Sequence, residues 1–169
     1  NEIVTWMDLE YGIYKPFGVF NRMWWNLNTN VNHLYAPRAY SNWTWVAEWA
    51  AVTRTFWFSK LGFEGQPLEG QDWFASRLDA LPFATPRWTS VEFVTSTDYR
   101  RKVALDGFVK RRVRPDMPDW QESFIRVAPR FRFSDRLSAD YVWSWQIRHN
   151  ERGWVDVVDD GQLSLFGQR

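Results

Sequence analysis

The sequence predicts an all-β fold, specifically an antiparallel up-and-down transmembrane β-barrel of about eight strands. Three observations predict it. Long segments alternate between apolar and polar residues, the chain is rich in aromatic residues although its mean hydropathy is only −0.49, and turn signals recur between the alternating segments. No linker or change of composition divides the chain, so we expect one domain over residues 1–169.

The most regular alternation covers residues 137–149. Its apolar and aromatic residues at odd positions are Leu137, Ala139, Tyr141, Trp143, Trp145 and Ile147. Because successive side chains of a strand point to opposite faces, this segment has one apolar and one polar face. A soluble strand usually ends after about five or six residues, whereas a membrane-crossing strand needs about 9–11. The length therefore predicts a membrane-spanning strand.

Residues 23–32 repeat the pattern with asparagines on the polar face, and residues 102–113 and 121–133 repeat it with charges. A row of asparagines cannot line a dry core without leaving amides unpaired, but it can line a water-filled or hydrogen-bonded interior. We therefore expect a polar lumen. The residues expected to line it are Asn26, Asn28, Asn30, Asn32, Arg126, Arg130, Asp140, Gln146 and Arg148.

Further charges share these inner faces: Glu48, Arg54, Glu92, Asp106, Lys110 and Glu122. Two interpretations are open for them. A pair of carboxylates could hydrolyse glycosidic bonds, but the sequence shows no defined separation between them. We favour ion pairs between neighbouring strands. No catalytic constellation emerges, so enzymatic activity is not expected.

The composition bounds the class of protein. The chain has 13 Trp, 13 Phe and 6 Tyr in 169 residues, which suits a lipid-facing band with aromatic girdles. Apolar runs break after about four or five residues, so no helix can span a bilayer. The net charge of +1 argues against a nucleic-acid surface. We interpret the basic run Arg111, Arg112 and Arg114 as a rim facing solvent or lipid headgroups.

Turn signals place the strands. The expected ranges are 3–13, 17–33, 41–59, 87–97, 100–113, 120–133, 137–149 and 154–167. The connections should alternate between tight turns near Asp98 and Asp135 and longer loops, of which 60–86 is the longest. Short periplasmic turns with longer outer loops are typical of outer-membrane barrels. The connection 34–40 falls on the short-turn end in this scheme although it is not short.

Both ends of the chain suggest a fragment. Asn1 is neither a start methionine nor part of a signal peptide, and Arg169 ends in an expected strand. Eight strands alone would make a narrow barrel filled by side chains. We expect instead a larger barrel, completed by further strands or by another chain.

Several short motifs resemble one family along nearly the whole chain. They are Tyr14-Lys15-Pro16-Phe17-Gly18, Phe56-Trp57-Phe58, the segment from Thr97 to Lys102, the turn from Arg132 to Ser138, and the terminal Leu165-Phe166-Gly167-Gln168-Arg169. They resemble the uncharacterised C-terminal outer-membrane barrel domain that follows a family-nine-like carbohydrate-binding module. The family often has a Gly-Gly-Pro step where this chain reads Asp79-Ala80-Leu81-Pro82. The resemblance implies a membrane barrel and supplies no catalytic residues.

Few residues suggest binding chemistry. His33 and His149 lack partners at ligand spacing, so we expect no metal and no cofactor. Trp73 and Trp88, near the long loop, are the best candidates for contact with a carbohydrate, and an interfacial aromatic girdle is the alternative for both.

The expected function is that of a bacterial outer-membrane β-barrel protein with a structural, assembly or transport-related role and with glycan handling at the cell surface. Its partners would be the lipid bilayer and outer-membrane lipids, other outer-membrane protein chains, and carbohydrate. The alternative is a soluble aromatic-rich β-sandwich that binds carbohydrate. That class predicts shorter strands, with the asparagine row on an exterior.

Overall fold

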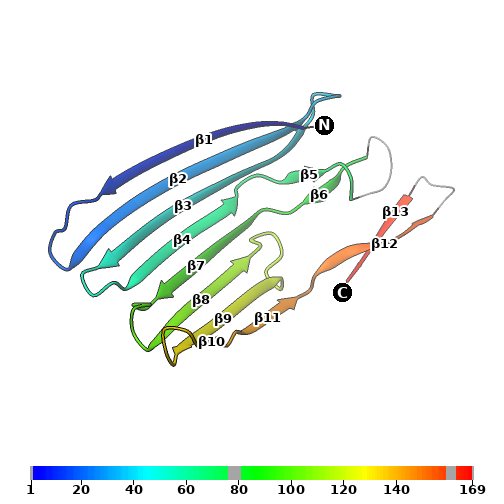
Figure 1. Cartoon of the computed structure of the whole chain (residues 1–169). Coiled ribbons are helices and arrows are strands. Elements are labelled where there is room, and N and C mark those ends of the chain that lie inside the picture. Colours follow the sequence, from blue (N-terminus) through cyan, green and yellow to red (C-terminus); the bar gives the residue numbers. More distant parts are fainter. Residues whose placement is uncertain (1, 76–80, 159–162, 169) are drawn as a thin grey trace.

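The computed structural model of the chain describes residues 2–75, 81–158 and 163–168. All regular secondary structure in these ranges is β, and Figure 1 shows most of it in one curved sheet. The strands are β1 (Glu2–Ile13), β2 (Phe20–Leu34), β3 (Tyr40–Thr53), β4 (Phe58–Gln66), β5 (Gly70–Asp72), β6 (Phe83–Thr85), β7 (Trp88–Ser96), β8 (Val103–Val113), β9 (Gln121–Arg132), β10 (Ser138–Asp140), β11 (Trp143–His149), β12 (Arg152–Val158) and β13 (Leu163–Gln168).

The main sheet follows the order β1-β2-β3-β4-β7-β8-β9-β10, and β11 also pairs with β9. Every neighbouring pair is antiparallel, which confirms the predicted all-β antiparallel class. The sheet is open within the described residues, because β1 pairs only with β2, and β10 and β11 pair only with β9. Strands β5 and β6 form a separate two-stranded arm, as do β12 and β13. No helix that could cross a bilayer occurs in the described part of the chain.

The prediction of one strand over 41–59 followed by a loop over 60–86 was wrong. Strand β3 ends at Thr53, a turn with Phe56 at φ 62° follows, and β4 then pairs with both β3 and β7. Glycines hid this strand, because Gly62 and Gly65 read as loop residues. Both lie in the ladder, where a side chain would meet the neighbouring strand.

Because β4 was not predicted, the connections that precede it lie at the opposite ends of the sheet from those that the predicted strands gave them. Connections 14–19, 54–57, 97–102 and 133–137 share one end of the sheet, and 35–39, 67–87 and 114–120 share the other (Figure 1). The connection 34–40 therefore belongs to the long-loop end, which removes the exception in the predicted scheme. The tight turns at Asp98 and Asp135 share an end, as predicted.

The predicted strand 137–149 is interrupted between β10 and β11. Both parts keep one register against β9, with Asp140 opposite Arg130 and Trp143 opposite Val127. Between them, Tyr141 donates its backbone N–H to the Pro129 carbonyl at 3.0 Å. Proline has no N–H to return the second hydrogen bond, so Pro129 interrupts the ladder without shifting its register.

The last predicted strand, 154–167, was also wrong as a single element. Its residues form two antiparallel strands, β12 and β13, which pair only with each other. The strands near 3–13, 17–33, 87–97, 100–113 and 120–133 are confirmed as β1, β2, β7, β8 and β9, with ends that differ by a few residues.

Candidate functional site

The main sheet has two faces that differ in chemistry. Directly paired residues lie on the same face of a sheet, and the main ladder pairs odd positions with odd and even with even. Only the register shifts near the two ends of β2 depart from this rule. We call the two sides the odd face and the even face. Away from those shifts, an odd or even residue number therefore tells on which face of the main sheet a side chain lies.

The odd face is apolar and largely exposed. One row of paired residues across it reads Tyr11, Trp25, Trp49, Leu61, Phe93, Val109, Ile125 and Trp145. The exposed fraction is 44% for Phe93 and 47% for Trp145, although neither lies in a turn. Apart from β5 against β3, the described strands contact mainly their sheet neighbours. No described layer therefore covers this face.

Polar residues interrupt the odd face near the long-loop end, where His33, Arg111, Gln121 and His149 lie close to strand ends. Exposed aromatic residues gather near the other end, at the ends of strands and in turns. They are Tyr11, Phe17, Phe56, Trp57, Phe133 and Tyr141. The apolar band is thus bounded at both ends by side chains suited to an interface.

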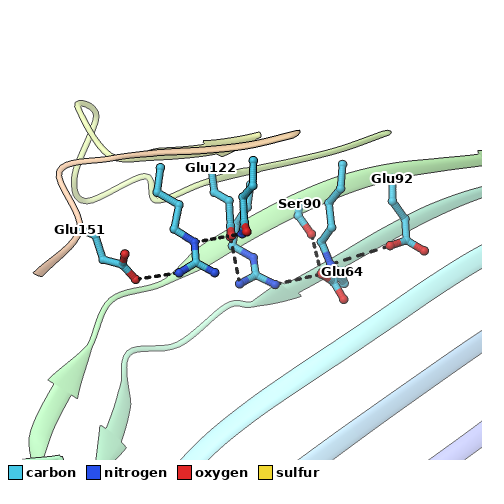
Figure 2. Close-up of polar contacts among 9 residues, drawn as sticks. Glu64, Ser90, Glu92, Glu122 and Glu151 are labelled. Carbon is cyan, nitrogen blue, oxygen red and sulfur yellow. Dashed lines mark hydrogen bonds and ion pairs between the residues drawn. The ribbon is translucent and has the colours of Figure 1, made fainter. Parts of the chain in front are cut away.

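The even face carries a continuous chain of ion pairs, which we call the charge ladder. On that face it comprises Glu48, Lys60, Glu92, Lys110, Glu64, Arg112, Glu122 and Arg148, and it ends at Glu151, which follows β11. Figure 2 shows most of it, with the carboxylates of Glu64, Glu92, Glu122 and Glu151 joined by dashed lines to cationic groups. Acidic and basic residues alternate along the ladder, so that inner members contact opposite charges on both sides.

The distances show close pairing. Lys60 Nζ lies 2.6 Å from Glu48 Oε1 and 2.7 Å from Glu92 Oε1. Arg112 reaches Glu64 at 3.2 Å and Glu122 at 3.6 Å, and Arg148 Nε lies 2.7 Å from Glu122 Oε1. The side chains of Glu92 and Glu122 are only 14% and 15% exposed. Half-buried charges of this kind are stabilised only while their partners remain in place.

Sequence reasoning found part of this ladder. Glu48, Glu92, Lys110, Glu122 and Arg148 were expected on one face and lie there in ion pairs. Gln146 also joins it, donating its amide N–H to Glu122 Oε1 at 2.6 Å. Lys60 and Glu64 were missed because the segment that holds them was taken for a loop.

The other residues expected in the lumen share the even face. Arg130 Nε lies 2.6 Å from Asp140 Oδ1, forming a separate pair outside the ladder. Arg126 lines a shallow cavity together with Phe108 and Phe124.

The asparagine row lies on the even face of β2. The Asn26 amide donates to Asp8 at 2.9 Å, Asn30 donates to Asn28 at 2.9 Å, and Asn32 donates to Asn42 at 3.0 Å. Each amide nitrogen in these three bonds therefore has a partner on the same strand or a neighbouring one. The row forms a hydrogen-bonded polar wall beside the charge ladder.

The two tryptophans expected to contact a ligand line one cleft of about 400 Å³ at the long-loop end. The β5–β6 arm forms one side, where Trp73 Nε1 donates to the Tyr40 carbonyl at 3.1 Å. Trp88 lies at the start of β7, and the Arg112 guanidinium stacks 4.2 Å from its ring centre. Trp73 follows β5 and Trp88 begins β7, and the pairing of β5 with β6 brings the two residues to one cleft.

The basic run is not a uniform rim. Arg111 has odd parity and donates to Gln121 at 2.7 Å, whereas Arg112 belongs to the charge ladder. Arg114 is half-buried and lines the cleft, with its guanidinium 3.9 Å from the ring centre of buried Trp120. The interpretation of all three as a solvated rim was therefore wrong for Arg112 and Arg114. Strand parity alone could have separated Arg111 from the other two.

Within the described ranges, no group of three His, Cys, Asp or Glu residues could hold a metal ion. His33 packs against Tyr40 in an edge-to-face contact of 5.9 Å, and His149 ends β11 on the opposite side of the sheet from the charge ladder. The described chemistry is thus that of paired charges, amides and aromatic rings.

These features define an all-β protein built on one antiparallel sheet, with an exposed apolar face and a charged face. The chain belongs to the domain family of unknown function DUF5916, whose family model matches residues 1–169. No curated protein and no solved structure matches the chain.

Proposed function

We propose that this chain is part of an outer-membrane β-barrel, with its odd face against lipid and its even face toward the interior. The observation that carries the proposal is the separation, by strand parity, of the exposed apolar row from the charge ladder. A soluble sheet hides its apolar face under a second layer. Here many large side chains of the apolar face are exposed, and the paired charges of the ladder lie on the other side.

Strand length supports a membrane location. The longer strands β1, β2, β3, β8 and β9 contain 12, 15, 14, 11 and 12 residues. A tilted strand needs about 9–11 residues to cross the hydrocarbon core. Aromatic residues at one end of the odd face and polar residues at the other match the two interfaces of a bilayer.

The edges of the sheet indicate a larger assembly. In lipid every backbone N–H and C=O must be paired, so the free edges at β1 and at β10–β11 need further strands. We propose that strands of the same protein or of another outer-membrane chain complete the barrel. The charge ladder would then brace its interior wall, which suits a structural or transport-related role rather than catalysis.

Cysteine probes at adjacent positions test the orientation of the faces. The chain has no cysteine, so Trp143→Cys and Ser144→Cys each introduce one reactive thiol. After spin labelling of the membrane-inserted full-length protein, we expect oxygen dissolved in lipid to relax the label at 143 more strongly than at 144. A water-soluble nickel complex should show the reverse preference. Equal accessibility at both sites, or recovery of the intact protein only in the soluble fraction, would reject the proposal.

A further inference from the structure

The cleft at the long-loop end contains one cation, Arg114, that forms no ion pair among the described residues. Arg114 follows β8 and lies over Trp120, and its Nε is shielded from solvent with no hydrogen-bond partner among the described residues. No carboxylate in that part of the chain forms an ion pair with it, whereas Arg112, on the same face, contacts both Glu64 and Glu122. Arg114 thus differs from the ladder cations.

The surroundings of Arg114 favour an anion. Burial lowers the pKa of Arg114 from its ordinary value, and the nearby Arg112 guanidinium lowers it further. The charges of Glu151 and Glu122, which form no ion pair with Arg114, raise that pKa by less. An arginine remains protonated at neutral pH even so, and its fork of N–H donors matches a carboxylate or a phosphate. An anion stabilises a half-buried guanidinium that has no ion-pair partner more than it stabilises an exposed guanidinium.

The rest of the cleft indicates more than a bare anion. Trp73 and Trp88 supply aromatic surface, and Asn42 lines the cleft with an amide nitrogen that makes no hydrogen bond within the described residues. Two carboxylates, Glu2 and Asp72, also line it. Carboxylates repel a free anion but accept hydrogen bonds from hydroxyl groups. Aromatic rings, amides and carboxylates together suit the faces and hydroxyls of a sugar ring.

We propose that this cleft binds an acidic saccharide, with its carboxylate or phosphate on Arg114 and its sugar ring against Trp73. The β5–β6 arm closes the site, because Trp73 is held to the start of β3 and Gln66 donates to the Thr85 carbonyl of β6 at 3.2 Å. Binding here does not depend on the odd face being in lipid. The site can therefore be tested apart from the proposed function.

Calorimetry with the full chain tests the proposal. The probes are a trigalacturonate, a hexose phosphate, neutral maltotriose and inorganic phosphate, each titrated into folded protein. We expect the trigalacturonate or the hexose phosphate to bind, and the better of the two identifies the preferred anionic group. Maltotriose and inorganic phosphate should bind at least about tenfold more weakly, because maltotriose has no anionic group and inorganic phosphate has no sugar ring. Equal binding of maltotriose, or no binding of either acidic sugar, would overturn the proposal.

Three variants assign the binding to the cleft. Arg114→Met should weaken the binding of the acidic sugar by about tenfold or more. Arg114→Lys should keep only part of the affinity, because an ammonium cannot form the bidentate contact. Arg111→Met is the matched control: it removes an arginine three residues away on the odd face and should leave affinity unchanged. Circular dichroism checks that each variant is folded. An equal loss in Arg111→Met and Arg114→Met would show general charge attraction and refute the site.

Discussion

Gly62 on β4 lies directly opposite Glu92 on β7, and a Cβ at position 62 would come within 2.8 Å of the Glu92 Cγ. The missing side chain leaves room for the Glu92 carboxylate to reach Lys60 from one side while Glu48 reaches it from the other. This glycine, which in the sequence suggests a loop, therefore permits a central part of the charge ladder.

We predict that Gly62→Ala destabilises the protein by displacing Glu92 from Lys60. Overpacking of this kind costs about 1–3 kcal/mol. Urea unfolding of the protein in lipid vesicles measures the change. Gly107→Ala is the control, since its Cβ would meet only the Thr95 Cγ2, at 3.2 Å on the odd face. Equal losses of unfolding free energy in Gly62→Ala and Gly107→Ala would mean that displacement of Glu92 from the ladder does not cause the destabilisation.

A charge on the odd face should be far more costly than one on the even face. Compared with Phe93→Ala, we expect Phe93→Arg to lose about 2–4 kcal/mol of unfolding free energy, the usual cost of arginine at mid-bilayer. Val94→Arg, compared with Val94→Ala, should lose much less because position 94 lies beside Phe93 on the opposite face. The same vesicle assay measures both differences. Similar costs at 93 and 94 would count against lipid contact.

Protease added to intact cells should cut the long-loop end. The connection that holds the arm exposes Leu68 at 52% and Phe74 at 68%, so we expect chymotrypsin to cleave at Phe74 and the Phe74→Ser variant to resist. The opposite end also exposes cleavable residues, Tyr99 at 43% and Phe133 at 66%. Those residues should be spared if their turns are periplasmic. Cleavage at Tyr99 or Phe133 with an intact arm would show that the tight turns, and not the arm, face the cell exterior.

The turn between β7 and β8 should keep its charge pair down to low pH. Hydrogen bonds from the Arg100 side chain and backbone hold the pKa of Asp98 at about 2, below its ordinary 3.8. Because the folded pKa is the lower one, the stabilisation is complete above 3.8 and is lost as the pH falls through about 2. The stability difference between wild type and Asp98→Asn should follow that course, and carboxyl NMR should give the pKa. A midpoint near 3.8 would show no such pairing.

Replacement of Pro129 should join β10 and β11. In Pro129→Ala the new backbone N–H faces Tyr141, whose own N–H already donates to the carbonyl of residue 129 at 3.0 Å. We expect the new amide at position 129 to exchange with solvent as slowly as the Tyr141 amide does, because the two residues then form a complete hydrogen-bonded pair. Rapid exchange at 129 alone would show that another feature separates the strands.

Much of the fold could be predicted because side-chain alternation with period two is a local property. Trp143 and Trp145 fall on one face and Ser144 and Gln146 on the other, whichever strands lie beside them. Where the alternation contains glycine, as at Gly62 and Gly65, the local signal fails. The strand there is recognisable only from its partners, since β4 fits between β3 and β7.

The candidate cleft could be predicted only in part. Two tryptophans near a long segment suggested ligand contact, but the sequence did not show that Arg114 would line the same cleft without an ion pair to any described carboxylate. Those properties depend on which side chains meet across strands that are distant in the sequence, and on the arm that holds Trp73 to the start of β3.

The sequence by itself determined the class of fold, the antiparallel order of most strands and the chemistry of the two faces, because these follow from residue alternation and turn residues along one chain. Tertiary structure decided the position of β4, the partners within the charge ladder and the isolation of Arg114. Each of these depends on the register between strands, and register fixes which charges lie within about 4 Å of one another and which remain unpaired.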